Sequence, residues 1–216
     1  MTRMGTTQFE DYISEVEDSL EHFEDGEMAE TTARLDNRVI KVLSDRKGRE
    51  HIIPNILDPF EPMFSKENKA QRIADITEAQ EDFSFSFPEV IHRNKEYMEL
   101  EYVEGVEMSD YLQDARMDVL EDLSYRMGEQ MSELHEEGWA LRDFNLDNII
   151  VEDSEEENFY IVDAELSKSD PKTVDKIWDV ASFLYNAEPG TQERYNRLSR
   201  NFCDSYGIPG YIEKPL

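Results

Sequence analysis

The first hundred residues contain several short runs in which apolar and polar side chains alternate, the pattern of half-buried strands. Asp36 and Asn37 form a pair that favours a tight hairpin turn between the first two runs. These alternating runs predict an antiparallel sheet in this part of the chain. The runs are residues 27–35, 38–43, 87–93 and 97–103.

Other segments space their apolar residues by three and four, which is the period of an amphipathic helix. One such segment, residues 65–80, lies within the sheet region, and Ala70, Ile73 and Ala74 fall near one of its faces. After residue 104 helices dominate. They are expected at residues 107–115, 117–138, 174–188 and 191–207, with a strand hairpin formed by residues 148–153 and 158–166.

The change of pattern near residue 104 predicts an α+β fold with two parts. Residues 1–103 form the sheet-rich part and residues 104–216 form the mainly helical part. Leu123, Met127 and Met131 share one face of the longest predicted helix, and we expect that face to pack in the core.

Polar residues interrupt this apolar pattern at three places. Lys41 is a cation on a predicted strand, with apolar residues on both sides in VIKVL. In WALRDFNLDNIIV, residues 139–151, Asp143 and Asn148 stand five residues apart, just before another strand. A carboxylate and a carboxamide at that place either cap a turn or position a metal ion and a hydroxyl group. Asp163 follows the next strand along the chain.

Taken in order, these segments resemble the protein kinase superfamily from about Gly26 to about Leu184. VIKVL resembles the strand that carries the phosphate-binding lysine, and LEYVEGVEMSDYL resembles the hinge and the helix after it. LHEEGWALRDFNLDNIIV resembles the catalytic loop, and YIVDAE resembles the metal-binding motif. The resemblance implies a bilobal fold: a small antiparallel β-sheet N-lobe with one helix and a mainly helical C-lobe.

The resemblance also implies a role for each of these polar residues, with ATP and Mg²⁺ as cofactors. Lys41, paired with Glu67, would hold the α- and β-phosphates of ATP. Asp143 would accept or orient the proton of the acceptor hydroxyl. Asn148 and Asp163 would hold Mg²⁺, which prefers oxygen ligands.

Adenine would lie in the hinge region, by the same resemblance. The carbonyl group of Glu101 and the amide of Val103 would meet its edge, and Leu100 would line the back of its pocket. In FEDGEMAETTARL only Gly26 would let the backbone approach the triphosphate closely.

The motifs depart from the usual kinase pattern in several places. Leu141 replaces the histidine before the arginine and aspartate of the catalytic loop, and Glu165 replaces the glycine of the metal-binding triplet. About fifteen residues separate Asp163 from Asp179, which resembles the helix aspartate that braces the catalytic loop. That interval is too short for a full activation segment. These features favour the compact, atypical RIO and Bud32-like branches.

The expected activity is therefore that of a small atypical serine/threonine protein kinase, and the sequence leaves its phosphoacceptor unknown. A small-molecule kinase of the choline-kinase or aminoglycoside type is the alternative, because Asp163-Ala164-Glu165 is similar to the aspartate-x-glutamate motif of those enzymes. A pseudokinase that serves as a binding scaffold is a further alternative. An acidic DNA mimic would explain the charge alone.

The chain is strongly acidic, with 51 Asp and Glu against 22 Lys and Arg and a formal net charge of -29. That balance excludes direct binding of nucleic acid or an anionic membrane through a basic surface. Acidic residues spread along the whole chain are typical of proteins from halophilic, salt-adapted sources. Molar salt there shortens the Debye length, and with it the range of charge repulsion, to about 3 Å.

Cys203 is the single cysteine, and we expect no zinc site. With no leader-like or membrane-spanning apolar run, we expect a cytoplasmic protein.

Overall fold

The computed structural model describes residues 31–35, 37–42, 66–82, 84–94, 97–152, 158–187 and 189–208. Its first sheet has four strands in the order β1-β2-β4-β3, and each neighbouring pair is antiparallel. The hairpin between the first two strands pairs Leu35 with Arg38, so the predicted turn is confirmed. The strands are β1 (Thr31–Leu35), β2 (Arg38–Val42), β3 (Val90–Arg93) and β4 (Tyr97–Glu101).

One helix packs against this sheet, as the sequence predicted. Helix α3 (Lys66–Glu78) buries Ala70 and Ile73 against Met98 and Leu100 of β4, and the short η2 (Gln80–Asp82) follows it. These apolar contacts form a small core that is separate from the main one. Because Leu100 belongs to this core, β4 is fixed between α3 and the rest of the sheet.

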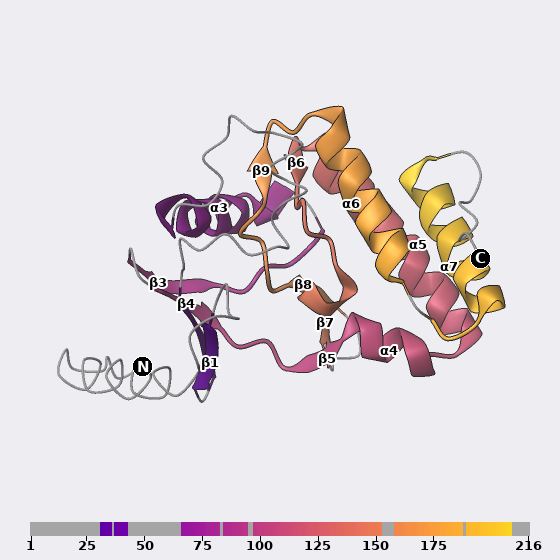
Figure 1. Cartoon of the computed structure of the whole chain (residues 1–216), viewed down its shortest axis with the longest axis horizontal. Coiled ribbons are helices and arrows are strands. Elements are labelled where there is room, and N and C mark those ends of the chain that lie inside the picture. Colours follow the sequence, from indigo (N-terminus) through magenta and orange to yellow (C-terminus); the bar gives the residue numbers. More distant parts are fainter. Residues whose placement is uncertain are drawn as a thin grey trace, which may run out of the picture.

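The remaining described residues are mainly helical, and α7 packs along α5 (Figure 1). A second antiparallel sheet has the order β5-β7-β8, and β6 pairs with β9. The helices are α4 (Met108–Asp114), α5 (Met117–Glu136), α6 (Thr173–Asn186) and α7 (Gln192–Tyr206). The strands are β5 (Gly105–Glu107), β6 (Trp139–Ala140), β7 (Ile149–Glu152), β8 (Phe159–Ile161) and β9 (Lys168–Ser169), and η3 (Leu146–Asn148) precedes β7.

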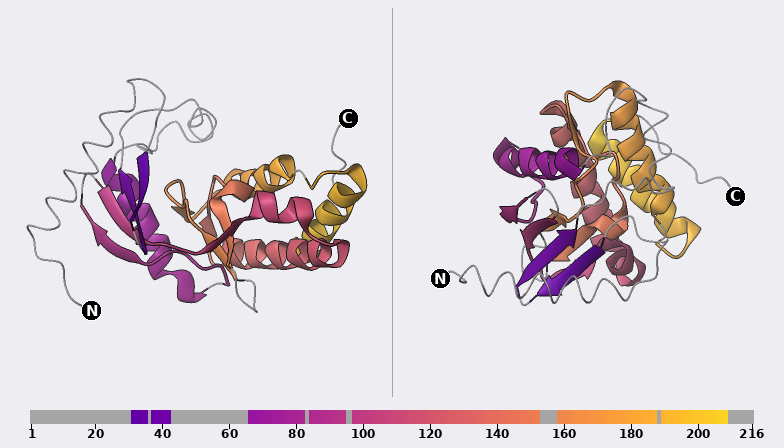
Figure 2. Two further views of the ribbon diagram at one scale, coloured as in Figure 1. Left: turned by 90° about the horizontal axis from the view of Figure 1, so that it is seen from below. Right: turned by 60° about the vertical axis from the view of Figure 1, so that its left-hand side comes forward.

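The mixed α+β class and the order of the main predicted elements are confirmed. Three short strands, β5, β6 and β9, were not predicted, because two or three residues are too few to show an alternating pattern. Figure 2 shows the four-stranded sheet and α3 at one end of the molecule and α5, α6 and α7 at the other. The chain passes between these ends through residues 102–104, just after β4.

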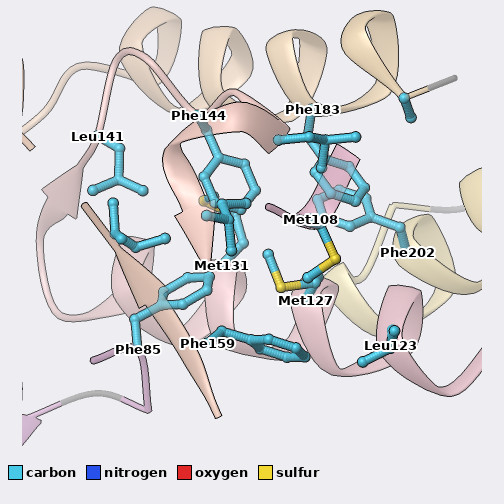
Figure 3. Packing of buried hydrophobic residues seen from close by; sticks show 14 of the residues in the cluster. Phe85, Met108, Leu123, Met127, Met131, Leu141, Phe144, Phe159, Phe183 and Phe202 are labelled. Carbon is cyan, nitrogen blue, oxygen red and sulfur yellow. The ribbon is translucent and has the colours of Figure 1, made fainter. Parts of the chain in front are cut away.

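Stacked aromatic rings lie in the main core and run from the loop before η3 into the helices (Figure 3). The ring of Phe144 stacks on that of Phe183 of α6 with centroids 5.4 Å apart, and Phe183 stacks on Phe202 of α7 at 4.3 Å. Phe85 meets the other side of Phe144 edge-on, at 5.7 Å. Since Phe144 directly follows Asp143, this packing fixes the backbone beside a predicted catalytic residue.

Candidate active site

A cavity of about 300 Å³ opens where the four-stranded sheet meets β7 and the segment after β8. Its size is at the lower end of the range for small-molecule sites. It collects six residues that the sequence singled out: Lys41, Leu100, Glu101, Val103, Asn148 and Asp163. The rest of its wall is mostly apolar and comes from Thr32, Val39, Pro88, Tyr102, Ile150 and Val162.

Lys41 and Asp163 form an ion pair in this cavity, although 122 positions separate them in the sequence. Lys41 Nζ donates a hydrogen bond of 2.8 Å to Asp163 Oδ1. The lysine side chain is only 6% exposed, whereas 26% of the aspartate side chain remains accessible. The sheet therefore presents its buried cation directly to the carboxylate that follows β8.

Glu165 lies behind this pair and contacts two lysines. Its Oε2 atom is 3.8 Å from Lys41 Nζ and 3.4 Å from Nζ of Lys69, which belongs to α3. The Lys69 side chain is fully buried, and that of Glu165 is 6% exposed. Neither residue was predicted as a site residue, although a lysine near apolar positions was the same signal that drew attention to Lys41.

Asn148 turns back toward Asp143 because η3 ends at this residue. Its Nδ2 atom donates to the backbone carbonyl of Asp143 at 3.3 Å and to Oδ2 of the same residue at 3.4 Å. With the amide nitrogen directed at Asp143, the carbonyl oxygen of the carboxamide is the atom suited to a metal ion.

The pKa of Asp143 is raised from its ordinary value of 3.8 to about 6. Burial of the carboxyl group is the main cause, and the negative charge of Asp163 adds to it. The Asn148 hydrogen bond and the Lys41 charge act in the opposite direction. A carboxyl group that titrates near neutral pH is suited to accept a proton from a hydroxyl group.

Asp179 braces the segment before Asp143, as the kinase resemblance implied. Its carboxylate accepts the backbone N–H of Leu141 at 2.8 Å and that of Arg142 at 2.6 Å, and its side chain is fully buried. Asp179 is therefore not an exposed residue on the surface of α6. Arg142 has a φ of 66°, a left-handed conformation that is uncommon for a residue with a side chain. Its Nε lies 3.1 Å from Asp175.

Two predicted site residues fall outside what the structure describes. Gly26 precedes the first described residue, and of Glu67 only the backbone, in the first turn of α3, is described. Their predicted parts in triphosphate binding and in the ion pair with Lys41 stay predictions. Leu100, Glu101 and Val103 do line the cavity, at and just after β4.

The residues at the cavity fit a magnesium ion held together with a nucleotide. Mg²⁺ in phosphotransferases is usually bound by one or two protein oxygen ligands, the phosphates and water. Asn148 and Asp163 offer such oxygen atoms on one cavity wall. Within the described part of the chain, no group of three or more His, Cys, Asp or Glu could hold a metal by itself.

A second hollow, of about 400 Å³, lies between α4 and the start of α7. It is larger, but its described lining contains no carboxylate and no cation: it consists of Gln113, Ala187, Pro189, Gly190, Thr191, Gln192 and Tyr195. Of these two cavities, the one beside Lys41 is the one whose described lining holds charged side chains. Over the described residues, no helix is long and apolar enough to cross a membrane.

Solved structures share this arrangement of elements, and 765 of their chains match the fold. One of them is described as "WaaP in complex with acyl carrier protein". It aligns with a TM-score of 0.56 and 13% sequence identity, over 87% of this chain and 81% of that chain. The chain therefore shares its fold with that structure. No family model matches the sequence, and no curated protein matches it. At this identity, the likeness to WaaP extends to the fold alone.

Proposed function

We propose that the protein is an ATP- and Mg²⁺-dependent phosphotransferase, and specifically a small atypical serine/threonine protein kinase of the RIO and Bud32-like kind. One observation carries the proposal: Lys41, Asn148 and Asp163, which come from distant parts of the sequence, line one cavity together with the residues that follow β4. A kinase needs a cation, two metal-binding oxygen atoms and an adenine pocket in that arrangement.

Each residue has a task in this proposal. Lys41 holds the α- and β-phosphates, and its ammonium group offsets negative charge there. Asn148 and Asp163 hold Mg²⁺, which when bound neutralises charge on the phosphates. Asp143 orients the acceptor hydroxyl and takes up its proton, and its pKa of about 6 suits that role.

The rest of the nucleotide would lie against the hinge. Leu100 packs on the adenine ring, while the Glu101 carbonyl and the Val103 amide meet its polar edge. We further propose that residues 1–103 and 104–216 are the two lobes on either side of ATP. In this arrangement, Gly26 approaches the triphosphate and Glu67 takes part in the ion pair with Lys41.

A small-molecule kinase is the second candidate, and one observation favours it. Glu165 of the Asp163-Ala164-Glu165 triplet lies within ion-pair distance of Lys41, so the triplet keeps a second acidic residue beside the cavity. A pseudokinase scaffold is the third candidate, and the missing catalytic-loop histidine is its support. A pseudokinase would have to retain all four kinase-like residues, Lys41, Asp143, Asn148 and Asp163, although it does not transfer phosphate.

One experiment separates these candidates. The protein is incubated with Mg²⁺, ATP labelled in the γ-phosphate and a size-fractionated lysate, with Asp163→Asn as the inactive control. Label in proteins that depends on Asp163 supports the protein kinase. Label confined to low-mass metabolites contradicts it in favour of the second candidate. MgATP binding without any transfer contradicts both enzymes and leaves the scaffold.

We also propose that the source is salt-adapted. The support is the net charge of -29 carried along the whole chain. Molar salt would screen the mutual repulsion of these acids and the repulsion between the protein and anionic ATP.

A further inference from the structure

We propose that Lys69 is a positioning residue, which through Glu165 holds Lys41 at Asp163 and at the phosphate site. This inference rests on the proposed function, since it assigns a residue to the same cavity. The kinase resemblance gave the ion-pair task of this helix to a carboxylate, Glu67. In addition, the structure buries a cation from the same helix, Lys69, against Glu165 in the segment after β8.

The first support is the cost of burying Lys69. Its side chain is fully buried, and the desolvation of an ammonium group is strongly unfavourable without a counter-ion. Glu165, also buried, is a carboxylate at 3.4 Å and offsets that cost. The ion pair therefore joins α3, which packs on the four-stranded sheet, to the segment after β8 on the mainly helical side of the molecule.

The second support is the arrangement of charges around Lys41. Two lysines, Lys41 and Lys69, lie close to two carboxylates, Asp163 and Glu165. Within this group Lys41 approaches Asp163 to 2.8 Å but stays 3.8 Å from Glu165. Lys69, at 3.4 Å, is the nearer of the two cations to Glu165. Lys69 thus competes for Glu165 and leaves Lys41 directed at Asp163.

Removing Lys69 should draw Lys41 toward Glu165 and away from the phosphate site. In Lys69→Met, which keeps an unbranched side chain of similar length, we expect intrinsic MgATP hydrolysis to lose roughly 10- to 100-fold in kcat, the range for a misplaced catalytic group. The KM for ATP should change much less, because adenine contacts are untouched. Gln71→Met, on the exposed part of α3, is the matched control and should leave both constants unchanged.

The amine reactivity of Lys41 gives a readout that needs no catalysis. Brief acetylation followed by mass spectrometry measures it in the whole protein. In Lys69→Met the Lys41 ammonium keeps both carboxylates, and Glu165 loses its contact with Lys69, so acetylation of Lys41 should slow. In Glu165→Gln it loses a carboxylate and keeps a neighbouring cation, so its acetylation should quicken. A merely structural role would loosen the site in both variants and raise both rates.

The double variant Lys69→Met/Glu165→Gln removes a buried charge pair and should melt closer to the wild type than either single variant does. Its kcat should recover as well, because no charged Glu165 remains to draw Lys41 away from Asp163. A double variant whose melting temperature recovers while its kcat stays as low as that of Lys69→Met overturns the proposal. It is also overturned if folded Lys69→Met keeps its kcat within about twofold, a difference below 1 kcal/mol. Should Lys69→Met fail to fold, Glu165→Gln and the double variant decide by the same criteria.

Failure of the proposed function would look different. A wild-type protein that neither binds nor hydrolyses MgATP would contradict the kinase, whatever the variants do. The acetylation rates would still test the link between Lys69 and Lys41: opposite changes support it, and equal changes overturn it.

Discussion

His135 Nε2 lies 3.1 Å from a carboxylate oxygen of Asp179, and both side chains are buried. The histidine comes from α5 and the aspartate from α6, and the Nδ1 atom of His135 meets the hydroxyl group of Tyr206 in α7 at 2.7 Å. The same Asp179 carboxylate holds the backbone of Leu141 and Arg142. Three helices therefore converge on the segment that carries Asp143. Leu141 stands where the kinase resemblance leads one to expect a histidine, and the histidine that contacts Asp179 here, His135, comes from α5.

Asp179→Ala should both destabilise the protein and slow transfer. It leaves two backbone N–H groups and His135 without the carboxylate they face, and each unsatisfied buried donor costs about 1–3 kcal/mol. We expect a loss of roughly 3–5 kcal/mol in the free energy of unfolding, the combined cost of these unsatisfied groups, measured by urea titration. Asp204→Ala removes an exposed acid of α7 and should change it by less than about 0.5 kcal/mol. Equal effects of the two substitutions would contradict the bracing role.

Asp143→Asn should abolish phosphate transfer and leave MgATP binding nearly intact. It should also stabilise the fold at pH 7. The folded-state pKa of about 6 exceeds the ordinary 3.8, so the folded protein binds this proton more tightly, and the free energy of unfolding falls as pH rises from about 4 to about 6. At pH 7 the variant should gain about 1–3 kcal/mol, since one pKa unit corresponds to about 1.4 kcal/mol. Urea titrations at pH 5 and pH 7 without Mg²⁺ check this, and an equal gain at both values would refute it.

Asp163→Asn should weaken Mg²⁺-dependent nucleotide binding. The substitution removes a proposed metal ligand and the carboxylate that pairs with Lys41 at 2.8 Å. Loss of one charge-assisted contact, about 1.5–3 kcal/mol, corresponds to roughly a 10- to 100-fold higher Kd for MgATP by titration calorimetry. Binding of ATP in EDTA should change much less. Asp147→Asn in the neighbouring η3 is a matched control, because Asp147 is exposed. Wild-type affinity in Asp163→Asn would remove the metal assignment.

Sequence periodicity predicted the main helices and strands because each long element buries one face, and burial leaves a regular apolar pattern. The same pattern drew attention to Lys41, a cation on an otherwise apolar strand. Lys69 carried a similar signal four residues before Ile73, on the buried side of α3. It was missed because lysines in a helix are usually solvated, and only the fold brings Glu165 to it.

The links between distant segments could not be predicted from the sequence. His135 and Asp179 stand 44 positions apart, and the apolar pattern within each helix does not indicate which other helix packs against it. The contact between Asp143 and Asn148 could be predicted more easily. The two residues are only five positions apart, and η3 between them brings their side chains together by local geometry. The placement of Asn148, Asp163 and Lys41 around one cavity was foreseeable only through the resemblance to kinases.

Gly128→Ala should destabilise the protein, although alanine is the better helix former. A Cβ atom at Gly128 would lie 2.4 Å from the backbone carbonyl oxygen of Phe202, so α5 and α7 would have to separate. Such overpacking typically costs about 1–3 kcal/mol, against about 1 kcal/mol gained in helix propensity. Thermal melting checks the sign. Glu129→Ala, next along α5 but exposed, should melt within a degree or two of the wild type.

Salt should raise both the stability and the nucleotide affinity of this protein. With a net charge of -29, folding brings like charges together, and ATP adds a further anion at a cavity that the carboxylate of Asp163 lines. Unit charges 4 Å apart in water repel by about 1 kcal/mol, and the Debye length falls from about 10 Å at 0.1 M to about 3 Å at 1 M salt. We therefore expect the melting temperature and the MgATP association constant to rise together between 0.1 and about 2 M KCl. A neutral osmolyte such as sucrose is the control, because it favours the compact state without screening charge. If the MgATP affinity were highest in dilute buffer and declined steadily toward molar KCl, adaptation to salt would not explain the acidic composition of this chain, which would then require another explanation.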